Sequence, residues 1–92
     1  MTGIDAPQEL MEFPCHFELK AFGPGEAESR FDDQVLAAIS TVVQASRQAM
    51  KKRSSSGGKY QCVSVLVTLQ SRQQLEAVYA ALRSIEGLKY LL

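Results

Sequence analysis

The chain has 92 residues, which is long enough for one domain with a modest hydrophobic core but too short for two. Its ten basic and ten acidic residues cancel, which excludes the overall positive field that draws a protein to nucleic acid or anionic membranes. The longest apolar run, residues 77–82, is far shorter than the roughly 18 residues of a helical membrane span. The acidic N-terminus lacks the order of a signal peptide, so we expect a cytoplasmic domain that spans no membrane.

The charges are unevenly distributed along the chain. Residues 1–33 carry eight acids and two bases, whereas the remaining 59 residues carry eight bases and two acids. Folding can average this asymmetry over the surface, or it can leave charged regions that guide self-association or a charged partner.

The first predicted element is a strand. Residues 1–12 show no sustained strand or helix period and are expected to form a flexible tail. From residue 13 apolar and polar side chains alternate, which predicts a strand with one buried face. Pro14 belongs at its start, where a missing N–H is tolerated, and the Gly-Pro-Gly sequence at residues 23–25 ends it.

A helix is predicted next. Ser29, with Asp32 three residues later, resembles a capping box, and Asp33 suits the positive end of a helix dipole. The apolar residues that follow share one stripe at helical spacing: Phe31, Val35, Ala38, Ile39, Val42 and Val43. This stripe predicts a helix that extends to about Ser46.

A β-hairpin is predicted between residues 48 and 69. Residues 48–54 could continue the helix, but context favours a lysine-rich edge strand, because lysine protects the edge of a sheet. The Ser/Gly tract 55–58 favours a turn, and residues 60–69 alternate cleanly between outward-facing and buried positions.

The last two predicted elements are a helix and a short strand. Ser71 and Gln74 form a second capping box, and Gly87 is placed to end the helix. The apolar stripe between them consists of Leu75, Val78, Tyr79, Leu82 and Ile85. Residues 88–92 then have room for one short strand.

The predicted order of elements is β-α-β-β-α-β. Right-handed crossovers pack both helices on the same face of the sheet. We therefore expect an α+β fold, the ferredoxin-like β-α-β-β-α-β sandwich, with a four-stranded, mainly antiparallel sheet and residues 13–92 as its single domain. The other face of the sheet stays open.

Several of these residues also resemble the pattern of a known family. The predicted strands carry Phe13-Pro14, Phe17, Lys20, Gly23, the motif Arg53-x-Ser55-Ser56-x-Gly58-Lys59-Tyr60 and the ending Leu88-Lys89-Tyr90-Leu91-Leu92. Over roughly residues 9–92 the chain is similar to the YbeD-like family of small, largely uncharacterised bacterial proteins.

The resemblance implies a ferredoxin-like fold similar to the ACT-type regulatory domains, which bind small metabolites. It also implies a genomic context, because members of this family are often encoded near lipoate-synthesis enzymes. The chain departs from the family pattern at Cys62, where a serine or another small polar residue is usual, and at Gly57, which makes the turn a double glycine.

Candidate catalytic residues are few. His16 is the one histidine, so no second imidazole can complete a metal site or an acid–base pair, and a half-exposed strand histidine is the simpler interpretation. The alternation places Cys15 on the helix-covered face and Cys62 on the open face, which excludes a disulfide between them. Lys59 and Arg53 would favour a Cys62 thiolate, but an inert cysteine is the simpler alternative. We expect no enzyme, no metal site and no cofactor.

The hairpin offers the best candidate binding residues. Residues 54–59 superficially resemble a phosphate-binding loop, but they lack its spacing and the helix that follows it. Free amides, hydroxyls and four bases could still hold an anion, although a solvated edge hairpin is the plainer alternative. The candidate ligand-binding or partner-binding residues are Lys20, Arg53, Ser55, Ser56, Gly58, Lys59 and Tyr60.

The open face is a candidate interface, because exposed apolar groups on a small sheet commonly mark one. The residues predicted to provide them are Tyr60, Cys62, Leu66 and Leu91. Domains that bind RNA stack bases on aromatic residues at alternating strand positions, but here Cys62 and Ser64 follow Tyr60, and Phe22 is the one further aromatic. We therefore expect no nucleic-acid binding.

Two functions fit these observations. The first is a non-catalytic regulatory or ligand-sensing module that acts as a homodimer, with the open face or an edge strand covered by a second copy. The alternative is a protein–protein adaptor that docks an acidic enzyme partner through the basic hairpin, residues 51–60.

Overall fold

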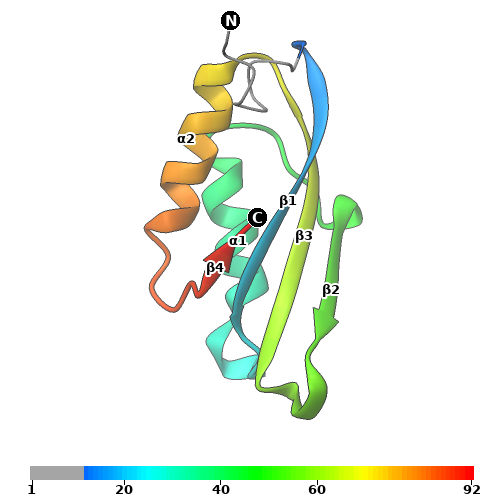
Figure 1. The fold of residues 1–92 in the computed structure, drawn as a ribbon, viewed down its shortest axis with the longest axis vertical. Helices are drawn as coiled ribbons and strands as arrows, with labels where there is room; N and C mark the ends of the chain where they lie inside the picture. Colours follow the sequence, from blue (N-terminus) through cyan, green and yellow to red (C-terminus); the bar gives the residue numbers. More distant parts are fainter. Residues whose placement is uncertain (1–11) are drawn as a thin grey trace, which may run out of the picture.

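The computed structural model describes residues 12–92, and its elements follow the predicted order. They are β1 (Cys15–Pro24), α1 (Phe31–Ser40), β2 (Met50–Ser54), β3 (Tyr60–Leu69), α2 (Arg72–Arg83) and β4 (Tyr90–Leu91). Both helices lie on the same side of the sheet (Figure 1), which confirms the ferredoxin-like fold. The tail predicted for residues 1–12 lies, except for Glu12, outside the described residues. Within residues 12–92, neither helix has the length and apolar character of a membrane span.

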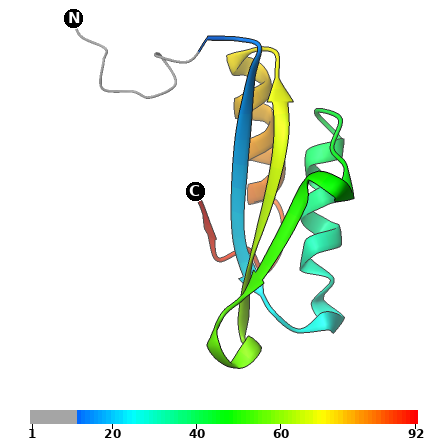
Figure 2. The same cartoon turned by 90° about the vertical axis from the view of Figure 1, so that its right-hand side faces the viewer.

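The sheet is built on one long central pair of strands. Its order is β2-β3-β1-β4, and every neighbouring pair is antiparallel. β1 and β3 pair along their whole length, from Cys15 opposite Leu69 to Pro24 opposite Tyr60. β2 pairs with β3 only up to Val65, and β4 pairs with β1 only at Ala21 and Phe22. Figure 2 shows both short strands beside the same half of the central pair, so the other half has no neighbouring strand among the described residues.

The hydrophobic core lies between the sheet and the two helices. Alternating residues of the central strands and one stripe from each helix supply the buried apolar side chains, as the sequence pattern predicts. They are Leu19, Ala21, Phe31, Val35, Ile39, Val63, Val65, Val67, Leu69, Leu75, Val78 and Leu82. Cys15 packs at the border of this core, whereas Cys62 lies on the opposite face, as predicted.

The prediction that Leu91 lies on the open face is wrong. Leu91 pairs with Ala21 and packs against the core, while Tyr90 pairs with Phe22 and faces the open side. A two-residue strand carries too little alternation to show which side faces inward. The register with β1 decides it.

Helix α1 is shorter than the apolar stripe predicts. It ends at Ser40 rather than about Ser46, and the Thr41 hydroxyl donates a hydrogen bond to the carbonyl of Ala38 at 2.7 Å. Thr41, Val42 and Val43 are consecutive β-branched residues, which lose side-chain freedom in a helix. Val42 and Val43 still pack against the core, but from an irregular segment.

Of the two predicted capping boxes, one does not form and the other is confirmed in part. At α1 the predicted box does not form: the N-cap is Arg30, at φ 52°, and the Ser29 hydroxyl instead accepts from the N–H of Phe31 at 3.3 Å. At α2 the prediction is confirmed in part, because the Ser71 hydroxyl accepts a hydrogen bond from the N–H of Gln74 at 3.2 Å. The Gln74 side chain, however, accepts from Gln70 rather than from Ser71.

The tip of the β2–β3 hairpin is tied to the end of β1. Gly57 and Gly58 have φ of +82° and +71°, a left-handed conformation that glycine adopts without steric cost. The N–H of Gly25 donates to the carbonyl of Lys59 at 3.0 Å. A side chain at Gly25 would place its Cβ 2.3 Å from the carbonyl oxygen of Gly58, so the close approach requires glycine.

Ion pairs join α1 to the sheet and to the segment before β2. Asp32 bonds to Lys52 of β2 at 3.0 Å, and this hydrogen bond holds the pKa of Asp32 below its ordinary value. Asp33 bonds to Arg47 and Arg30, which lower its pKa in the same way. Part of the charge asymmetry along the chain is therefore neutralised inside the domain.

Replacing Gly25 by alanine should destabilise the fold by about 1–3 kcal/mol, because backbone must move to admit the new Cβ. Urea denaturation measures this free energy of unfolding. Gly57→Asn is the matched control: Gly57 is surrounded by open space, and asparagine tolerates a left-handed conformation, so its effect should be small. Equal losses in both variants would show that the tip is not held against β1.

The pH dependence of stability should reveal the pair between Asp32 and Lys52. Because the pKa of Asp32 is lowered on folding, the pair stabilises the fold above the unfolded pKa of about 3.9, and this contribution is lost as pH falls through the folded pKa. Asp32→Asn should therefore cost about 0.2–1 kcal/mol near neutral pH and progressively less in acid. Urea denaturation across this pH range measures the difference.

The control for this experiment is the same substitution in a Lys52→Met background, which removes the partner. There Asp32→Asn should have little effect at any pH. If the cost of Asp32→Asn in the unmodified protein does not change with pH, the pair makes no contribution of this kind.

Candidate functional site

The candidate site is the open face of the sheet, on the side away from both helices. Strand alternation and register place one set of side chains there. They are His16, Glu18, Lys20 and Phe22 of β1, Lys51 and Arg53 of β2, Tyr60, Cys62, Ser64, Leu66 and Thr68 of β3, and Tyr90 of β4.

The basic run of β2 is divided between the two faces. Lys51 lies opposite Ser64 and Arg53 opposite Cys62, so both point to the open side. Lys52 lies opposite Val63 on the helix side, where it bonds to Asp32. From the sequence, the bases of residues 51–60 are taken together as one basic hairpin, whereas the pairing of β2 with β3 divides them between the two faces.

Four bases gather on the open face, and we call them the basic face: Lys20, Lys51, Arg53 and Lys89. Lys20 lies opposite Ser64, which has Lys51 on its other side, so these three residues form one row across the sheet. Among the described strand residues that face this side, Glu18 is the one acid, and it lies 3.9 Å from Lys20. The open face therefore has a local excess of positive charge, although the chain as a whole is neutral.

Three aromatic rings lie at one end of the open face. The rings of Phe22 and Tyr90 have centroids 5.6 Å apart, and the ammonium group of Lys89 lies 5.5 Å from the centroid of the Tyr60 ring. Together these four residues line a shallow, mainly apolar hollow of about 310 Å³. Tyr90 is 56% exposed and Tyr60 is 44% exposed. The sequence does not identify Tyr90 as an aromatic residue of the open face, because the register of β4 with β1 decides on which face the Tyr90 side chain lies.

Three amides of the hairpin tip, which the sequence offers as possible anion ligands, are bonded within the turn. The N–H of Ser55 donates to the carbonyl of Tyr60, and the N–H of Gly58 donates to the carbonyl of Ser55. The Ser55 hydroxyl accepts from the N–H of Tyr60 at 3.1 Å. These amides therefore already have partners within the turn, whose 3-10 segment begins at Ser56.

The seven predicted site residues are thus divided between two places. Lys20, Arg53 and Tyr60 lie on the open face, whereas the other four form the hairpin tip: Ser55, Ser56, Gly58 and Lys59. The tip adjoins the face through Tyr60.

The residues with catalytic potential are not brought together. The Nδ1 atom of His16 lies 3.1 Å from the hydroxyl of Thr68. Cys62 lies opposite Phe22, six positions along β1 from His16, which corresponds to about 20 Å. Cys62 has the Ser64 hydroxyl 4.0 Å from its sulfur. The one histidine therefore cannot serve as a base for Cys62.

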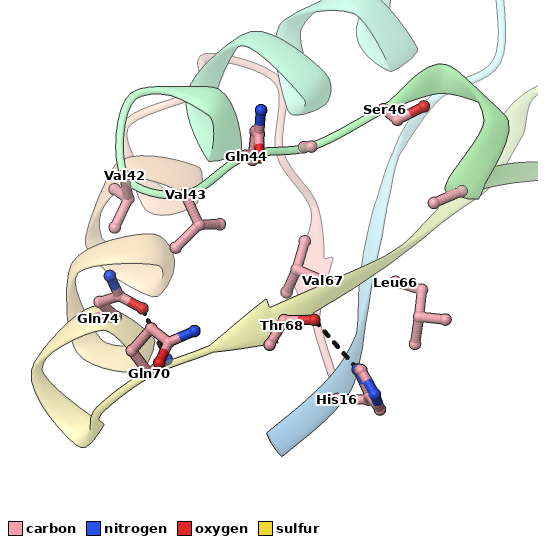
Figure 3. A pocket seen from close by; sticks show the side chains of 12 residues that line it. His16, Val42, Val43, Gln44, Ser46, Leu66, Val67, Thr68, Gln70 and Gln74 are labelled. Atoms are coloured by element: carbon pink, nitrogen blue, oxygen red, sulfur yellow. Dashed lines mark hydrogen bonds between the residues drawn. The ribbon is translucent and has the colours of Figure 1, made fainter. Parts of the chain in front are cut away.

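A second hollow lies at the opposite end of β3 (Figure 3). It has a volume of about 760 Å³ and runs between residues 42–46 and the end of β3. Val42 and Val43 lie on one side of it, and Leu66 and Thr68 lie on the other. We call this hollow the edge slot. The sequence reading missed it, because it exists only where the chain leaves α1 early.

Known proteins resemble this chain over almost its whole length. The family model described as a protein of unknown function, DUF493, matches residues 8–92. A UPF0250 protein of Shewanella sediminis is 39% identical over 84 residues, which are 91% of this chain and 92% of that protein. A UPF0250 protein of Chromobacterium violaceum is 36% identical over 93 residues, covering 96% and 98% of the two chains.

A solved structure supports the fold independently. The solution structure of protein HP0495 from H. pylori matches with a TM-score of 0.69 and covers 100% of this chain and 96% of its own. The sequences are only 9% identical, so this likeness concerns the fold alone. The family matches confirm the resemblance to the YbeD-like proteins: the chain belongs to the DUF493 family, together with its UPF0250 relatives.

Proposed function

We propose that this protein is a non-catalytic adaptor that docks an acidic protein partner on the open face of its sheet. The observation that carries the proposal is the separation of charge within β2. Lys52 is turned to the helix side and paired with Asp32, whereas Lys51 and Arg53 join Lys20 and Lys89 on a face that has one acid, Glu18.

The physical properties of the face suit such a partner. Opposite charge steers association and discriminates against basic proteins. Exposed aromatic rings supply the anchors that protein interfaces use most, and Tyr60 and Tyr90 lie beside the bases. The hollow between them is shallow, which favours a broad surface over an enclosed metabolite.

The proposed contact surface is the open face of the sheet and includes only part of the hairpin. The sequence alternative used residues 51–60, but Lys52 is paired with Asp32, and three of the turn amides are bonded within the tip. The proposed contact residues are Lys20, Lys51, Arg53, Tyr60, Lys89 and Tyr90.

The ligand-sensing homodimer stays a prediction. A two-fold dimer through the open face would set each basic face against its own copy, and the repulsion between like charges opposes this arrangement. A metabolite that binds the folded protein would raise its melting temperature, so a thermal-shift screen tests ligand sensing separately.

The adaptor proposal is tested by titrating the protein with a synthetic acidic peptide rich in Glu and Leu, with NMR shifts as the readout. Shifts should concentrate on the basic face and the neighbouring aromatic residues. Binding should disappear at about 1 M salt, where the Debye length is only about 3 Å. The double variant Lys51→Glu, Arg53→Glu should weaken binding at least about tenfold, or about 1.4 kcal/mol.

Lys52→Glu is the control, because it reverses one charge on the same strand but on the other face. It should leave peptide binding within about twofold of the unmodified protein. An equal loss in Lys52→Glu and in the double variant would contradict a specific face. Tighter binding of a single-stranded oligouridylate than of the peptide would assign the face to nucleic acid instead.

A further inference from the structure

The edge of β3 is left uncovered where β2 stops. β2 begins at Met50, opposite Val65, and the residues before it turn away from the sheet in the 3-10 segment Arg47–Ala49. The Ser46 hydroxyl caps this turn by accepting from the N–H of Gln48, and the N–H of Ala49 donates to the carbonyl of Ser46. These bonds keep the chain from continuing along β3.

The main chain of Leu66 and Thr68 points to this uncovered edge. On the same side of β3, the carbonyl of Tyr60 accepts from Ser55. In an antiparallel strand every second residue directs its N–H and C=O to the same side, and the β1–β3 register is continuous. Leu66 and Thr68 are therefore directed away from β1. The N–H of Leu66 faces Ala49 at the end of the β2 pairing, whereas the carbonyl of Leu66 and both main-chain groups of Thr68 lie beyond the last pair, Met50 opposite Val65.

The edge slot lies along this part of β3. The part of β3 beside it, residues 66–69, is flanked by Val42 and Val43 from the segment after α1 (Figure 3). The far end is bordered by Gln70 and Gln74. At about 3.3 Å per residue, the uncovered edge matches four or five residues of an extended chain.

The charge of the slot indicates what it accepts. Its lining consists of apolar side chains, amides, hydroxyls and His16, with no Asp, Glu, Lys or Arg among them. The uncovered edge of β1 differs, because Glu18 lies on it and Lys20 follows, and charges on an edge strand discourage pairing. The slot beside β3 lacks this protection, so a neutral strand meets no charge there.

We propose that the edge slot binds an extended, uncharged peptide segment of another protein, which pairs with residues 66–70 as an additional strand of the sheet. Main-chain hydrogen bonds to Leu66 and Thr68 provide the pairing. Alternate apolar side chains of the peptide would meet Val42 and Val43 on the helix side. This site is separate from the basic face and does not depend on the proposed adaptor function.

A second copy of the chain fits the slot less well. Two β3 edges paired antiparallel would place both helix layers on the same side of the joined sheet. The segment 42–46 of each copy would then stand over the β3 edge of the other, so the two segments would compete for the same space. We therefore commit to a peptide strand, and self-pairing is an outcome that the test can detect.

The test is amide hydrogen exchange, measured by NMR, with a capped hexapeptide of alternating valine and threonine as the probe. With about nine-tenths of the protein bound, exchange at Thr68 should slow about tenfold, because it then proceeds from the free tenth. A second hexapeptide, N-methylated at two adjacent central amides, lacks donors on both edges of its strand and should give no slowing.

Two variants sharpen the result. Thr68→Pro removes the Thr68 N–H from the slot and should abolish the amide shifts that the first hexapeptide causes along residues 66–70, because proline cannot donate to the added strand. Glu18→Pro is the matched control, since it removes an edge N–H from β1 instead. If the Thr68→Pro protein does not fold, the comparison of the two hexapeptides on the unmodified protein still tests the proposal.

The proposal is overturned if both hexapeptides have equal effects or if neither slows exchange at Thr68. It is also overturned if the Thr68 amide is already slow without peptide and becomes fast on dilution, because a second copy then occupies the edge.

Discussion

The antiparallel register between β1 and β3 is the constraint on which the other features depend. The ten residues of each strand pair without interruption, so a single phase of alternation decides which side chains enter the core and which face outward. A shift of one residue would exchange Val63 and Val65 for Cys62 and Ser64 in the core. The burial of Leu19 between the helices and the sheet sets the phase of β1 in the same way.

The short edge strands pair with the central strands, and this pairing decides which of their charged side chains lie on the open face. β2 pairs with β3 over five residues, which turns Lys52 toward Asp32 in the first turn of α1 and leaves Lys51 and Arg53 on the open side. The register of β4 with β1 places Tyr90 opposite Phe22 on the open face. A neutral chain thereby gains one face with an excess of bases next to aromatic rings. Such a surface favours an acidic partner, because opposite charges attract at long range and exposed rings add contact area.

The difference in length between the central and edge strands has a second consequence. β2 and β4 cover the same half of the central pair, so the two candidate contact surfaces lie toward opposite ends of β3. The aromatic hollow includes Tyr60 at one end, and the edge slot runs from Leu66 to Gln70 at the other. An adaptor could use both at once, since neither surface overlaps the other. Helix α2 contributes Gln74 to the edge slot, and the core holds the strands in register.

The sequence by itself determined the elements whose signals are local. The alternation from residue 60 to 69 predicted β3 and its buried face, Ser71 marked the start of α2, and the order of elements indicated the ferredoxin-like fold. Tertiary structure decided the features that arise between elements. The early end of α1, the inward direction of Leu91 and the division of Lys51 from Lys52 follow from pairing and from bonds to distant residues. Those contacts join residues far apart in the chain, so no local pattern of side chains encodes them.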